Sequence, residues 1–340
     1  MPDVTVTSDI DTFLKSSNNS TARTNLGASS QADLDAKQDI LAEGAFVDGD
    51  KTKLDDAVTS NNSAFLGYTH KTETTFNETV SKNVVGELNA GNLPSITGNH
   101  NLIIGNNVTS IASYTNFMTG TLHGALVIPD SVTSIGAYAF YFNSGITSLN
   151  MGNGVTTVSY GCFSGCSSLT SLTLSNSLVT IGYDCFSYCD HITGSLTIPD
   201  SVTTIGSNAF YGCSGFTGSL TLGDSVASIG GGAFASCSGL TGSLTIPDSV
   251  TSIGGNAFSS CSGFTGSLTI PDSVTTIDGY AFSNCSGLTN VNCHVTRTIM
   301  NSYGALAATG VTTLHAEAGK GWTAGADTIG GKALTVIIDL

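Results

Sequence analysis

Positively charged side chains are scarce in this chain and absent from most of its length. Only ten of its 340 residues are Lys or Arg, against 25 Asp or Glu, and none of the ten lies between residues 83 and 296. Binding to nucleic-acid phosphates needs a basic surface, and docking on anionic lipids needs one too. We therefore expect no nucleic-acid partner and no attachment to a lipid surface.

Long apolar segments are also missing. The sequence contains no run of 18 apolar residues, so it predicts no membrane insertion. The opening stretch, MPDVTVTSDIDTF, is acidic and lacks the apolar core of a secretory signal. We expect synthesis in the cytoplasm of a host cell and release by another route, such as lysis.

Recognisable catalytic motifs are a third absence. The six His residues are scattered at spacings that do not suit a metal site. The nucleophile-elbow, phosphate-loop and paired-glutamate motifs are missing as well. The sequence therefore predicts a protein that is not an enzyme and that needs no cofactor.

What the chain does contain is a repeat of about 24 residues. The best copies read GSLTIPDSVTxIGxxAFxxCSG, followed by Leu or Phe and then Thr, and looser copies precede them. About eight copies span residues 102–290. Such a short fixed period is typical of a solenoid of stacked coils. The clearest columns are Leu196, Leu220, Leu244 and Leu268; Ile205, Ile229, Ile253 and Ile277; Phe210, Phe234, Phe258 and Phe282; and Cys213, Cys237, Cys261 and Cys285.

Each copy predicts two short strands and a third buried side. Alternation in SLTI predicts one strand, VTxI predicts the second, and the intervening PD is a turn signal. The Ala, Phe and Cys of AFxxC are expected to be buried in a short helical turn. Burying six apolar side chains contributes on the order of 10 kcal/mol, whereas ordering one copy costs roughly 24 kcal/mol or more. One copy is therefore unstable alone, and the fold class that follows is a β-rich solenoid.

The repeat pattern LxIPxSVxxIGxxAFxxCSxL resembles the BspA-type leucine-rich repeat of bacterial surface proteins. The resemblance covers about residues 102–290, with departures such as Gly223 in place of Pro and Asn143 in place of Cys. It implies a leucine-rich-repeat solenoid that serves in binding and adhesion, and it does not identify a ligand.

The segments outside the repeat divide the chain further. Residues 1–64 contain short amphipathic pieces, each too narrow to fold alone, which predicts a short helical N-terminal oligomerisation stalk. Residues 65–101 are expected to form a transition and an N-terminal cap, and residues 291–340 a C-terminal cap. Within the latter, Trp322 is interpreted as part of the cap, with a platform for glycan binding as the alternative.

The N-terminal segment resembles the connector region of bacteriophage tail fibres. The resemblance rests on DIDTFLKSSNNSTARTNLGA at residues 9–28 and on ADLDAKQDILAEGAFVDGDKTKLD at residues 32–55. It implies a homotrimer that is attached to other virion proteins through its N-terminus. The implied location is the virion, on either the tail or the capsid surface.

Two columns of the repeat contain residue types that bind metals. The spacing of Cys162, Cys166, Cys185 and Cys189 suits a metal site or a disulfide between coils, but buried Cys also packs well in a column. The Asp of the turn suits either a cation or turn capping. We favour packing and capping, and expect no metal. The Asp column consists of Asp130, Asp200, Asp224, Asp248 and Asp272.

Tyrosines around AFxxC are the candidate receptor-binding residues. Seven of the ten occupy variable positions that flank the buried Phe and Cys columns, so we expect most of them on one outer face. Tyr offers rigid contact area and a hydroxyl, although the same side chains could shield the turn or pack between chains. An alternative binding face is formed by the strand Ser and Thr residues, from Ser195 to Thr269. The seven candidates are Tyr138, Tyr141, Tyr160, Tyr183, Tyr188, Tyr211 and Tyr280.

Together these patterns predict a virion fibre protein that binds a glycan or protein on the bacterial host surface through its solenoid. Linking several weak sites in one fibre would give avidity. The alternatives are a capsid-decorating or spacer fibre, a bacterial surface adhesin and, more remotely, a depolymerase.

Overall fold

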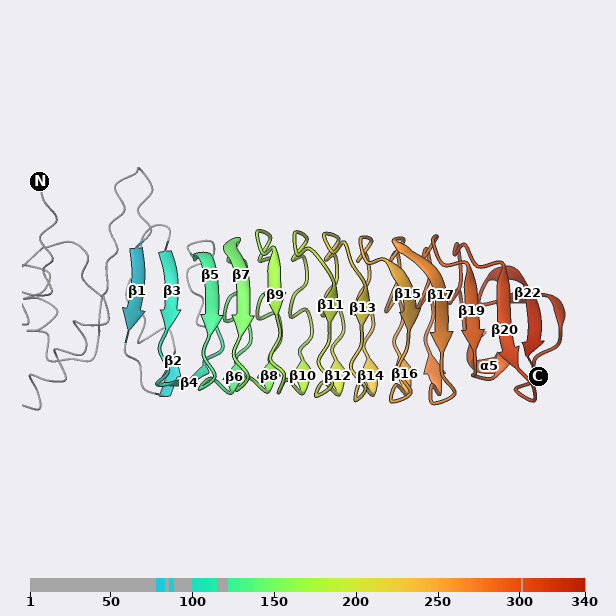
Figure 1. The fold of residues 1–340 in the computed structure, drawn as a ribbon, viewed down its shortest axis with the longest axis horizontal. Helices are drawn as coiled ribbons and strands as arrows, with labels where there is room; N and C mark the ends of the chain where they lie inside the picture. Colours follow the sequence, from blue (N-terminus) through green and yellow to red (C-terminus); the bar gives the residue numbers. More distant parts are fainter. Residues whose placement is uncertain (1–77, 83–85, 89–99, 115–121, 301, 340) are drawn as a thin grey trace, which may run out of the picture.

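The protein is an elongated solenoid of short strands stacked along its long axis (Figure 1). Leu196 pairs with Leu220, and Ile205 pairs with Ile229, in parallel register. The repeats therefore lie side by side as their spacing predicts, and the β-rich solenoid is confirmed. The computed structural model describes residues 78–82, 86–88, 100–114, 122–300 and 302–339. The predicted N-terminal stalk lies outside these residues.

Two rows of strands run along the solenoid. The SLTI row is divided into sheets of five, two and six strands, and the VTxI row is a single sheet of nine. The first row contains β1 (Glu78–Lys82), β3 (His100–Ile104), β5 (His123–Ile128), β7 (Gly145–Met151), β9 (Ser171–Thr173), β11 (Leu196–Thr197), β13 (Leu220–Thr221), β15 (Gly242–Thr245), β17 (Phe264–Ile270), β19 (Asn290–Cys293), β20 (Thr313–Glu317), β22 (Lys332–Asp339) and β21 (Gly325–Ile329). The second contains β2 (Gly86–Leu88), β4 (Val108–Ile111), β6 (Ser134–Ile135), β8 (Thr157–Val158), β10 (Thr180–Ile181), β12 (Thr204–Ile205), β14 (Ser228–Ile229), β16 (Ser252–Ile253) and β18 (Thr276–Ile277).

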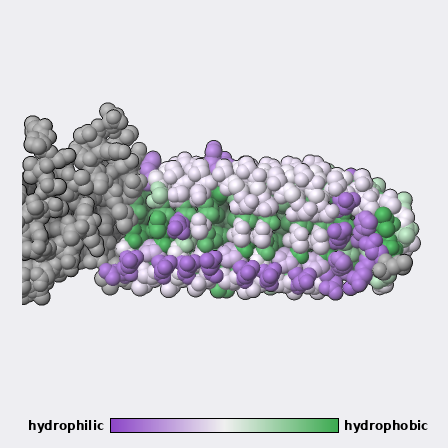
Figure 2. Space-filling view, in the orientation of Figure 1, coloured by the Kyte–Doolittle hydropathy of each residue, from purple (hydrophilic) through white to green (hydrophobic). Residues whose placement is uncertain are grey.

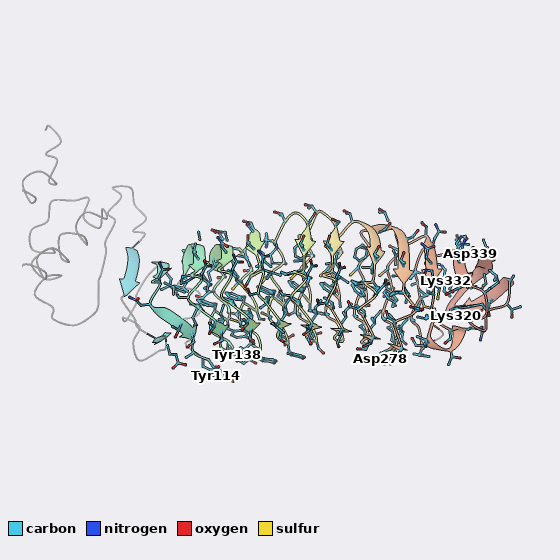
Figure 3. The ribbon with its side chains drawn as sticks, turned by 60° about the horizontal axis from the view of Figure 1, so that its bottom comes forward. Tyr114, Tyr138, Asp278, Lys320, Lys332 and Asp339 are labelled. Atoms are coloured by element: carbon cyan, nitrogen blue, oxygen red, sulfur yellow. The ribbon has the colours of Figure 1, made fainter. Side chains whose placement is uncertain are left out.

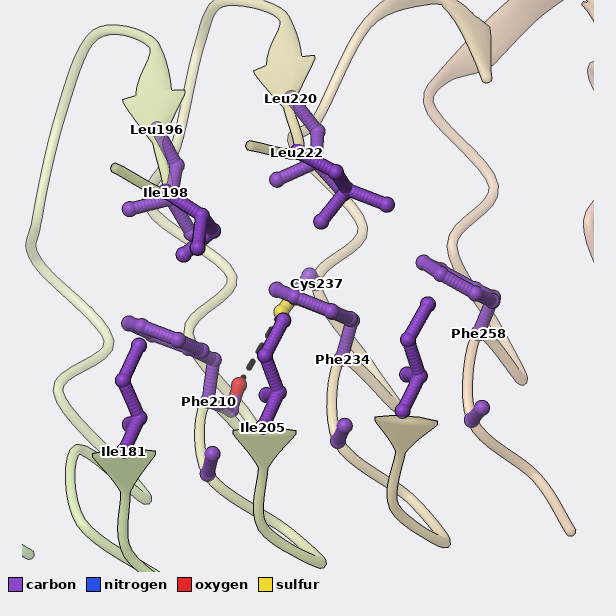
Figure 4. Close-up of a cluster of buried hydrophobic side chains, with 14 of the residues drawn as sticks. Ile181, Leu196, Ile198, Ile205, Phe210, Leu220, Leu222, Phe234, Cys237 and Phe258 are labelled. Carbon is purple, nitrogen blue, oxygen red and sulfur yellow. Dashed lines mark hydrogen bonds between the residues drawn. The ribbon is translucent and has the colours of Figure 1, made fainter. Parts of the chain in front are cut away.

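The core consists of columns of identical side chains that stack from coil to coil. Seven buried Phe rings, from Phe140 to Phe282, lie with centroids 5.0–5.6 Å apart and planes within 3–11° of parallel. Leu and Ile from both strand rows face these rings (Figure 4). The thiol of Cys237 donates a hydrogen bond to the Phe210 carbonyl oxygen at 3.0 Å. Each coil thus buries its apolar side chains mainly against the coils on either side of it.

The third side of each coil, which carries AFxxC, is a row of turns, so the predicted short helical turn is wrong. Among the described residues the only helix is α5 (Arg297–Met300). Two residues per coil, four positions apart, have a positive φ, which no residue of a right-handed helix has. We call these positions the left-handed slots. The first slot holds Tyr114, Tyr138, Gly161, Asp184, Asn208, Gly232, Asn256, Tyr280 and Gly304; the second holds Phe142, Gly165, Tyr188, Gly212, Ser236, Ser260, Asn284 and Ala308.

Hydrogen bonds between coils stabilise the turn row. The Phe210 N–H donates to Ala233 O at 2.7 Å, and the Tyr188 N–H donates to Tyr211 O at 2.7 Å. Alternate N–H groups thus bond to the next coil, while those between them close turns within their own coil, as Tyr211 N does to Asn208 O at 3.0 Å. The row is therefore a rigid, hydrogen-bonded platform for the side chains that project from it.

The backbone of Gly239, in the CSG motif of one copy, lies close to the preceding coil, whereas Ser168 and His191 occupy the same position in two earlier copies. A Cβ on Gly239 would overlap the carbonyl oxygens of Ser214 and Phe216 on the preceding coil. We expect Gly239→Ala to lower the free energy of unfolding by about 1–3 kcal/mol. Thermal or denaturant unfolding measures this loss. Gly105→Ala is the matched control, since a Cβ there meets nothing within 4 Å, and an equal loss in both variants would contradict the explanation.

The parallel ladder continues beyond residue 290, where the sequence predicts the C-terminal cap to begin. Strand β19 pairs with β20, which pairs with β22, both in parallel. At the end, β21 pairs with β22 in antiparallel orientation. Arg297 donates two hydrogen bonds of 3.0 Å to the Asp327 carboxylate on β21, and this contact lowers the pKa of Asp327.

At the N-terminal end of the solenoid, strand β1, which lies upstream of residue 102, already pairs with β3. The predicted division into four segments stays a prediction.

No helix among the described residues is long and apolar enough to cross a bilayer. The surface is arranged in rows, as the repeat requires. Figure 2 shows a line of hydrophilic residues running along the solenoid beside a band of hydrophobic ones.

Candidate ligand-binding surface

The turn row presents the predicted tyrosines on the outside of the solenoid. Tyr114 and Tyr138 lie close together along the edge on which Asp278 also lies (Figure 3). Several of these rings are well exposed, among them Tyr188 at 57% and Tyr183 at 41%. Tyr138, Tyr188 and Tyr280 occupy left-handed slots.

Most of the aromatic side chains converge on one surface hollow, which we call the aromatic hollow. Its volume is about 360 Å³. Five of the seven predicted tyrosines line it, and Tyr183 stacks on one of them, Tyr160, with centroids 4.9 Å apart. Tyr280 lies further along the row and contacts Tyr303 instead. The lining residues are Tyr138, Tyr141, Phe142, Tyr160, Gly161, Ser164, Asp184, Ser187, Tyr188, Asn208 and Tyr211.

The rings of the aromatic hollow form two groups. In the first, Tyr138 meets Tyr160 at 75° with centroids 4.8 Å apart, and Tyr141 meets Phe142 at 71° with centroids 4.5 Å apart. In the second, Tyr188 and Tyr211 meet at 75° and 5.3 Å. Such edge-to-face contacts fix the orientation of rings that also remain open to a ligand.

Polar groups lie among these rings. The Asn208 amide nitrogen donates to the Tyr183 hydroxyl at 3.2 Å. Partial burial raises the pKa of Asp184 above its ordinary value, and interaction with the Asn208 side chain offsets part of that rise. The side chains of Ser164 and Ser187 are nearly fully buried.

The phenols of the aromatic hollow interact with one another. A hydrogen bond with Tyr160, together with desolvation, raises the pKa of Tyr138 to about 12. The neighbouring Tyr211 phenol raises the pKa of Tyr188. Both phenols are therefore neutral at physiological pH, and the carboxylate of Asp184 is the one charge among the described lining residues.

Large aromatic residues are unusual in the left-handed slots. Other coils place Gly, Asn, Ser, Asp or Ala there, and a bulky residue with positive φ is a steric outlier. Four of these rings lie over a Gly in the same slot of the next coil: Tyr138 over Gly161, Phe142 over Gly165, Tyr188 over Gly212 and Tyr280 over Gly304. The fifth, Tyr114, lies beside Tyr138, with ring centroids 5.3 Å apart. Cover of these glycines offsets part of the strain, but the glycine-filled coils show that the fold does not need an aromatic ring there.

Sequence reasoning missed four residues of the turn row. Asp184 and Asn208 lie in the first left-handed slot, and their 24-residue step was the signal that could have placed them beside the tyrosines. Tyr114 and Tyr303 are exposed at 67% and 78%. They lie at the two ends of the described turn row, where the repeat is degenerate.

A second hollow, of about 780 Å³, lies over β3, β5 and β7. Its described lining is aliphatic and polar, including Val127, Pro129 and Met151, and it contains no aromatic side chain. It therefore lacks the rigid anchors that characterise a binding centre.

The cysteines form a buried packing column. All nine are free, and the thiols of the repeating column donate to the Phe carbonyl oxygen of an adjacent coil, for example Cys213 to Phe186 at 3.0 Å. No group of three or more metal-binding side chains is found among the described residues. The Cys162, Cys166, Cys185 and Cys189 cluster thus lies in the dry core, beside carbonyl groups.

Burial raises the pKa of all nine thiols. Because the thiolate is the reactive form, we expect an aromatic disulfide reagent to label none of the nine cysteines in the native protein. Unfolding in guanidinium should expose all nine to the reagent. Rapid labelling of the native protein, or fewer than nine thiols after unfolding without reductant, would contradict the packing interpretation.

Two aspartates of the Asp column cap backbone groups of the following coil. The Asp130 carboxylate accepts from Asn153 N at 2.7 Å, and the Asp200 carboxylate accepts from Asp224 N at 3.2 Å. Trp322 is half-buried, and its indole N–H donates to Val295 O at 3.0 Å. Both features have a structural explanation, which leaves the turn row as the candidate ligand-binding surface.

Fold and surface together define a leucine-rich-repeat solenoid with an aromatic patch on its turn row. The model of the BspA type leucine rich repeat region matches residues 95–217 and 216–317, with six copies. The chain therefore belongs to the BspA-type leucine-rich-repeat family.

The similar solved structures include three bacterial proteins. A leucine-rich repeat protein from Bacteroides ovatus is 23% identical, with 75% of this chain and 70% of that chain covered and a TM-score of 0.47. The leucine rich repeat protein of T. pallidum is 22% identical, with coverage of 54% and 72% and a TM-score of 0.38. The pneumococcal vaccine antigen PcpA is 16% identical, with coverage of 70% and 73% and a TM-score of 0.37. No curated protein matches the sequence.

Proposed function

We propose that this solenoid is a binding module that attaches to the surface of bacterial cells through the aromatic hollow. The observation that carries the proposal is the cluster of six rings that line the hollow, three of which occupy left-handed slots that most other coils fill with small residues. Exposed Tyr side chains supply large contact area at low entropic cost, and aromatic residues dominate the energetics of binding sites. The ligand is a glycan or a protein of the cell surface.

We further propose that the solenoid belongs to a virion fibre. Support comes from the resemblance of residues 9–28 and 32–55 to tail-fibre connectors, although these residues lie outside the described structure. In this proposal the N-terminal segment forms a homotrimer and binds other virion proteins. Three linked solenoids would then bind a cell with avidity, so each single site can be weak.

The second candidate is a bacterial surface adhesin, which the BspA-type family membership favours. A capsid-decorating or spacer fibre shares the same N-terminal argument as the tail fibre. The adhesin would use the same proposed binding surface on a bacterial cell. The capsid-decorating or spacer fibre would use the same N-terminal anchor at another place on the virion.

Immunogold electron microscopy of lysates from the source organism, with antibody against residues 102–290, separates the locations. Label at phage tails supports the tail fibre, and label over capsids favours decoration. Label on cell surfaces without particles overturns the virion proposal in favour of the adhesin.

Binding itself is tested with the purified full chain on intact host cells. Saturable attachment supports the proposed function. Attachment that is equal on host and unrelated cells, or that does not saturate, overturns it.

A further inference from the structure

We propose that the aromatic hollow binds an uncharged sugar unit of a glycan, with Asp184 and Asn208 contacting its hydroxyl groups. This inference rests on the proposed function, because it specifies the ligand of the same surface. It also predicts selectivity, since acidic and cationic ligands of similar size should be rejected.

The paired carboxylate and amide match the hydrogen-bonding chemistry of a sugar. Asp184 accepts hydrogen bonds, Asn208 both donates and accepts, and each sugar hydroxyl can do both. The two side chains come from adjacent coils in the same left-handed slot, and both line the hollow. The Asn208 bond to Tyr183 at 3.2 Å further fixes the amide. This arrangement is preorganised, so a ligand does not have to order it.

The rings match the other surface of a sugar, which is apolar. The two ring groups, Tyr138 with Tyr160 and Tyr188 with Tyr211, line the same hollow. A volume of about 360 Å³ lies at the lower end of ligand-site volumes and suits about one or two sugar units. A ligand that is apolar on its faces and polar at its rim fits rings and hydrogen-bonding groups at the same time.

Charge excludes acidic sugars. No Lys or Arg occurs between residues 83 and 296, and the described lining of the hollow contains no His. A uronic or sialic acid carboxylate would lie near the Asp184 carboxylate, well within the screening length of about 8 Å at physiological salt. It would lose its hydration without gaining a cationic partner, which is unfavourable.

A quaternary ammonium ligand fits less well than a neutral sugar. Aromatic rings do attract such cations, and Asp184 would add to the attraction. However, a quaternary ammonium group has no hydrogen-bonding atom, so it would cover the Asn208 amide and the Tyr hydroxyls without replacing their water. Leaving such polar groups unsatisfied is costly.

Binding of the purified full chain to ligand-coated beads tests the proposal. The neutral probes are glucose, galactose, mannose and N-acetylglucosamine; the acidic probes are glucuronic acid and N-acetylneuraminic acid; and the cationic probe is choline. We expect at least one neutral probe to bind at least tenfold more tightly than every acidic probe and choline. Preference for choline or for an acidic probe, or no binding to any neutral probe, overturns the proposal.

Two substitutions then test the residues. Asp184→Asn and Asn208→Gly should each weaken binding of the neutral probe about tenfold, while Asn256→Gly should not. Asn256 is the matched control because it occupies the same slot two coils further along, with φ of 58° against 54° for Asn208. Equal effects of Asn208→Gly and Asn256→Gly would overturn the assignment.

The pH dependence provides a readout that folding alone would not give. The carboxylate form of Asp184 is the stronger acceptor, and its pKa is raised, so affinity should fall as the pH drops through a value above the ordinary Asp range. The other titratable groups that line the hollow are phenols, whose ordinary pKa is near 10. The Asp184→Asn variant should lose this dependence, and an unchanged pH profile in that variant overturns the role of Asp184.

Failure of this inference is distinguishable from failure of the proposed function. A chain that binds host cells but none of the neutral probes refutes the sugar assignment and leaves surface binding intact. A chain that does not bind host cells refutes the proposed function itself.

Discussion

Replacing three rings of the aromatic hollow with the small residues that other coils use should abolish cell binding without unfolding the protein. The variant is Tyr138→Asn, Phe142→Gly and Tyr188→Gly. Loss of a central aromatic contact weakens binding by about 2 kcal/mol or more, which is roughly 30-fold. Three such losses would remove measurable attachment of the purified chain to host cells.

The fold should tolerate these changes because the slots already favour Asn and Gly. Relief of the left-handed strain contributes about 1 kcal/mol per site, and loss of the ring contacts costs about 0.5–1.5 kcal/mol. The two effects offset each other, so the midpoint of thermal unfolding should change little. This outcome separates a role in ligand binding from a role in covering the backbone. If the rings were needed to cover Gly161, Gly165 and Gly212, their removal would lower the free energy of unfolding.

Tyr280→Asn is the matched control for this variant. Tyr280 has the same positive φ as Tyr138 and also lies over a glycine of the next coil, but it is outside the aromatic hollow. We expect it to bind cells as the unmodified chain does. A folded triple variant that still binds would exclude the hollow as the site, and weakened binding by Tyr280→Asn would extend the site along the turn row.

The repeat made the strand rows predictable. Leu196, Ile205 and Phe210 recur at a fixed step, and stacked coils bring each residue beside its own copy. Period and burial therefore specify the register with no knowledge of long-range contacts. The burial of the Cys column, whose residue recurs six times, was predictable for the same reason.

The turn row was harder to predict because its spacing has two interpretations. Ala209, Phe210 and Cys213 have a spacing that suits one face of a helical turn, yet the chain forms turns with two left-handed residues. Asn208 and Gly212 were the available signals for positive φ. In the coil of Tyr138 and Phe142 this signal is missing, because aromatic residues rarely adopt a positive φ.

The candidate surface was predictable as a face but not as a site. Variable positions beside the buried columns had to point outward, which placed the tyrosines on one side. Their convergence on a single hollow, the separate position of Tyr280 and the pairing of Asp184 with Asn208 depend on which coils carry them. The repeat describes an average coil, whereas the site is made from the departures of a few coils from that average.

The Phe column is expected to determine the stability of the solenoid. Phe210 is fully buried and stacks between Phe186 and Phe234, with centroids 5.2 and 5.4 Å away. We expect Phe210→Ala to lower the free energy of unfolding by about 3–5 kcal/mol, as measured by denaturant unfolding. Phe142→Gly is the control at an exposed ring, and it should change that free energy by less than about 1 kcal/mol.

The same substitution at Phe258 separates stability from binding. Phe258 stacks between Phe234 and Phe282, with centroids 5.2 and 5.6 Å away, so its loss should cost as much as that of Phe210. Of these two residues, Phe210 precedes Tyr211, which lines the aromatic hollow, whereas neither sequence neighbour of Phe258 lines it. Phe210→Ala should therefore weaken cell binding at a temperature where both variants are folded, while Phe258→Ala should not. A loss below about 1 kcal/mol in both variants would show that coil-to-coil stability depends on the strand ladders instead of the ring column.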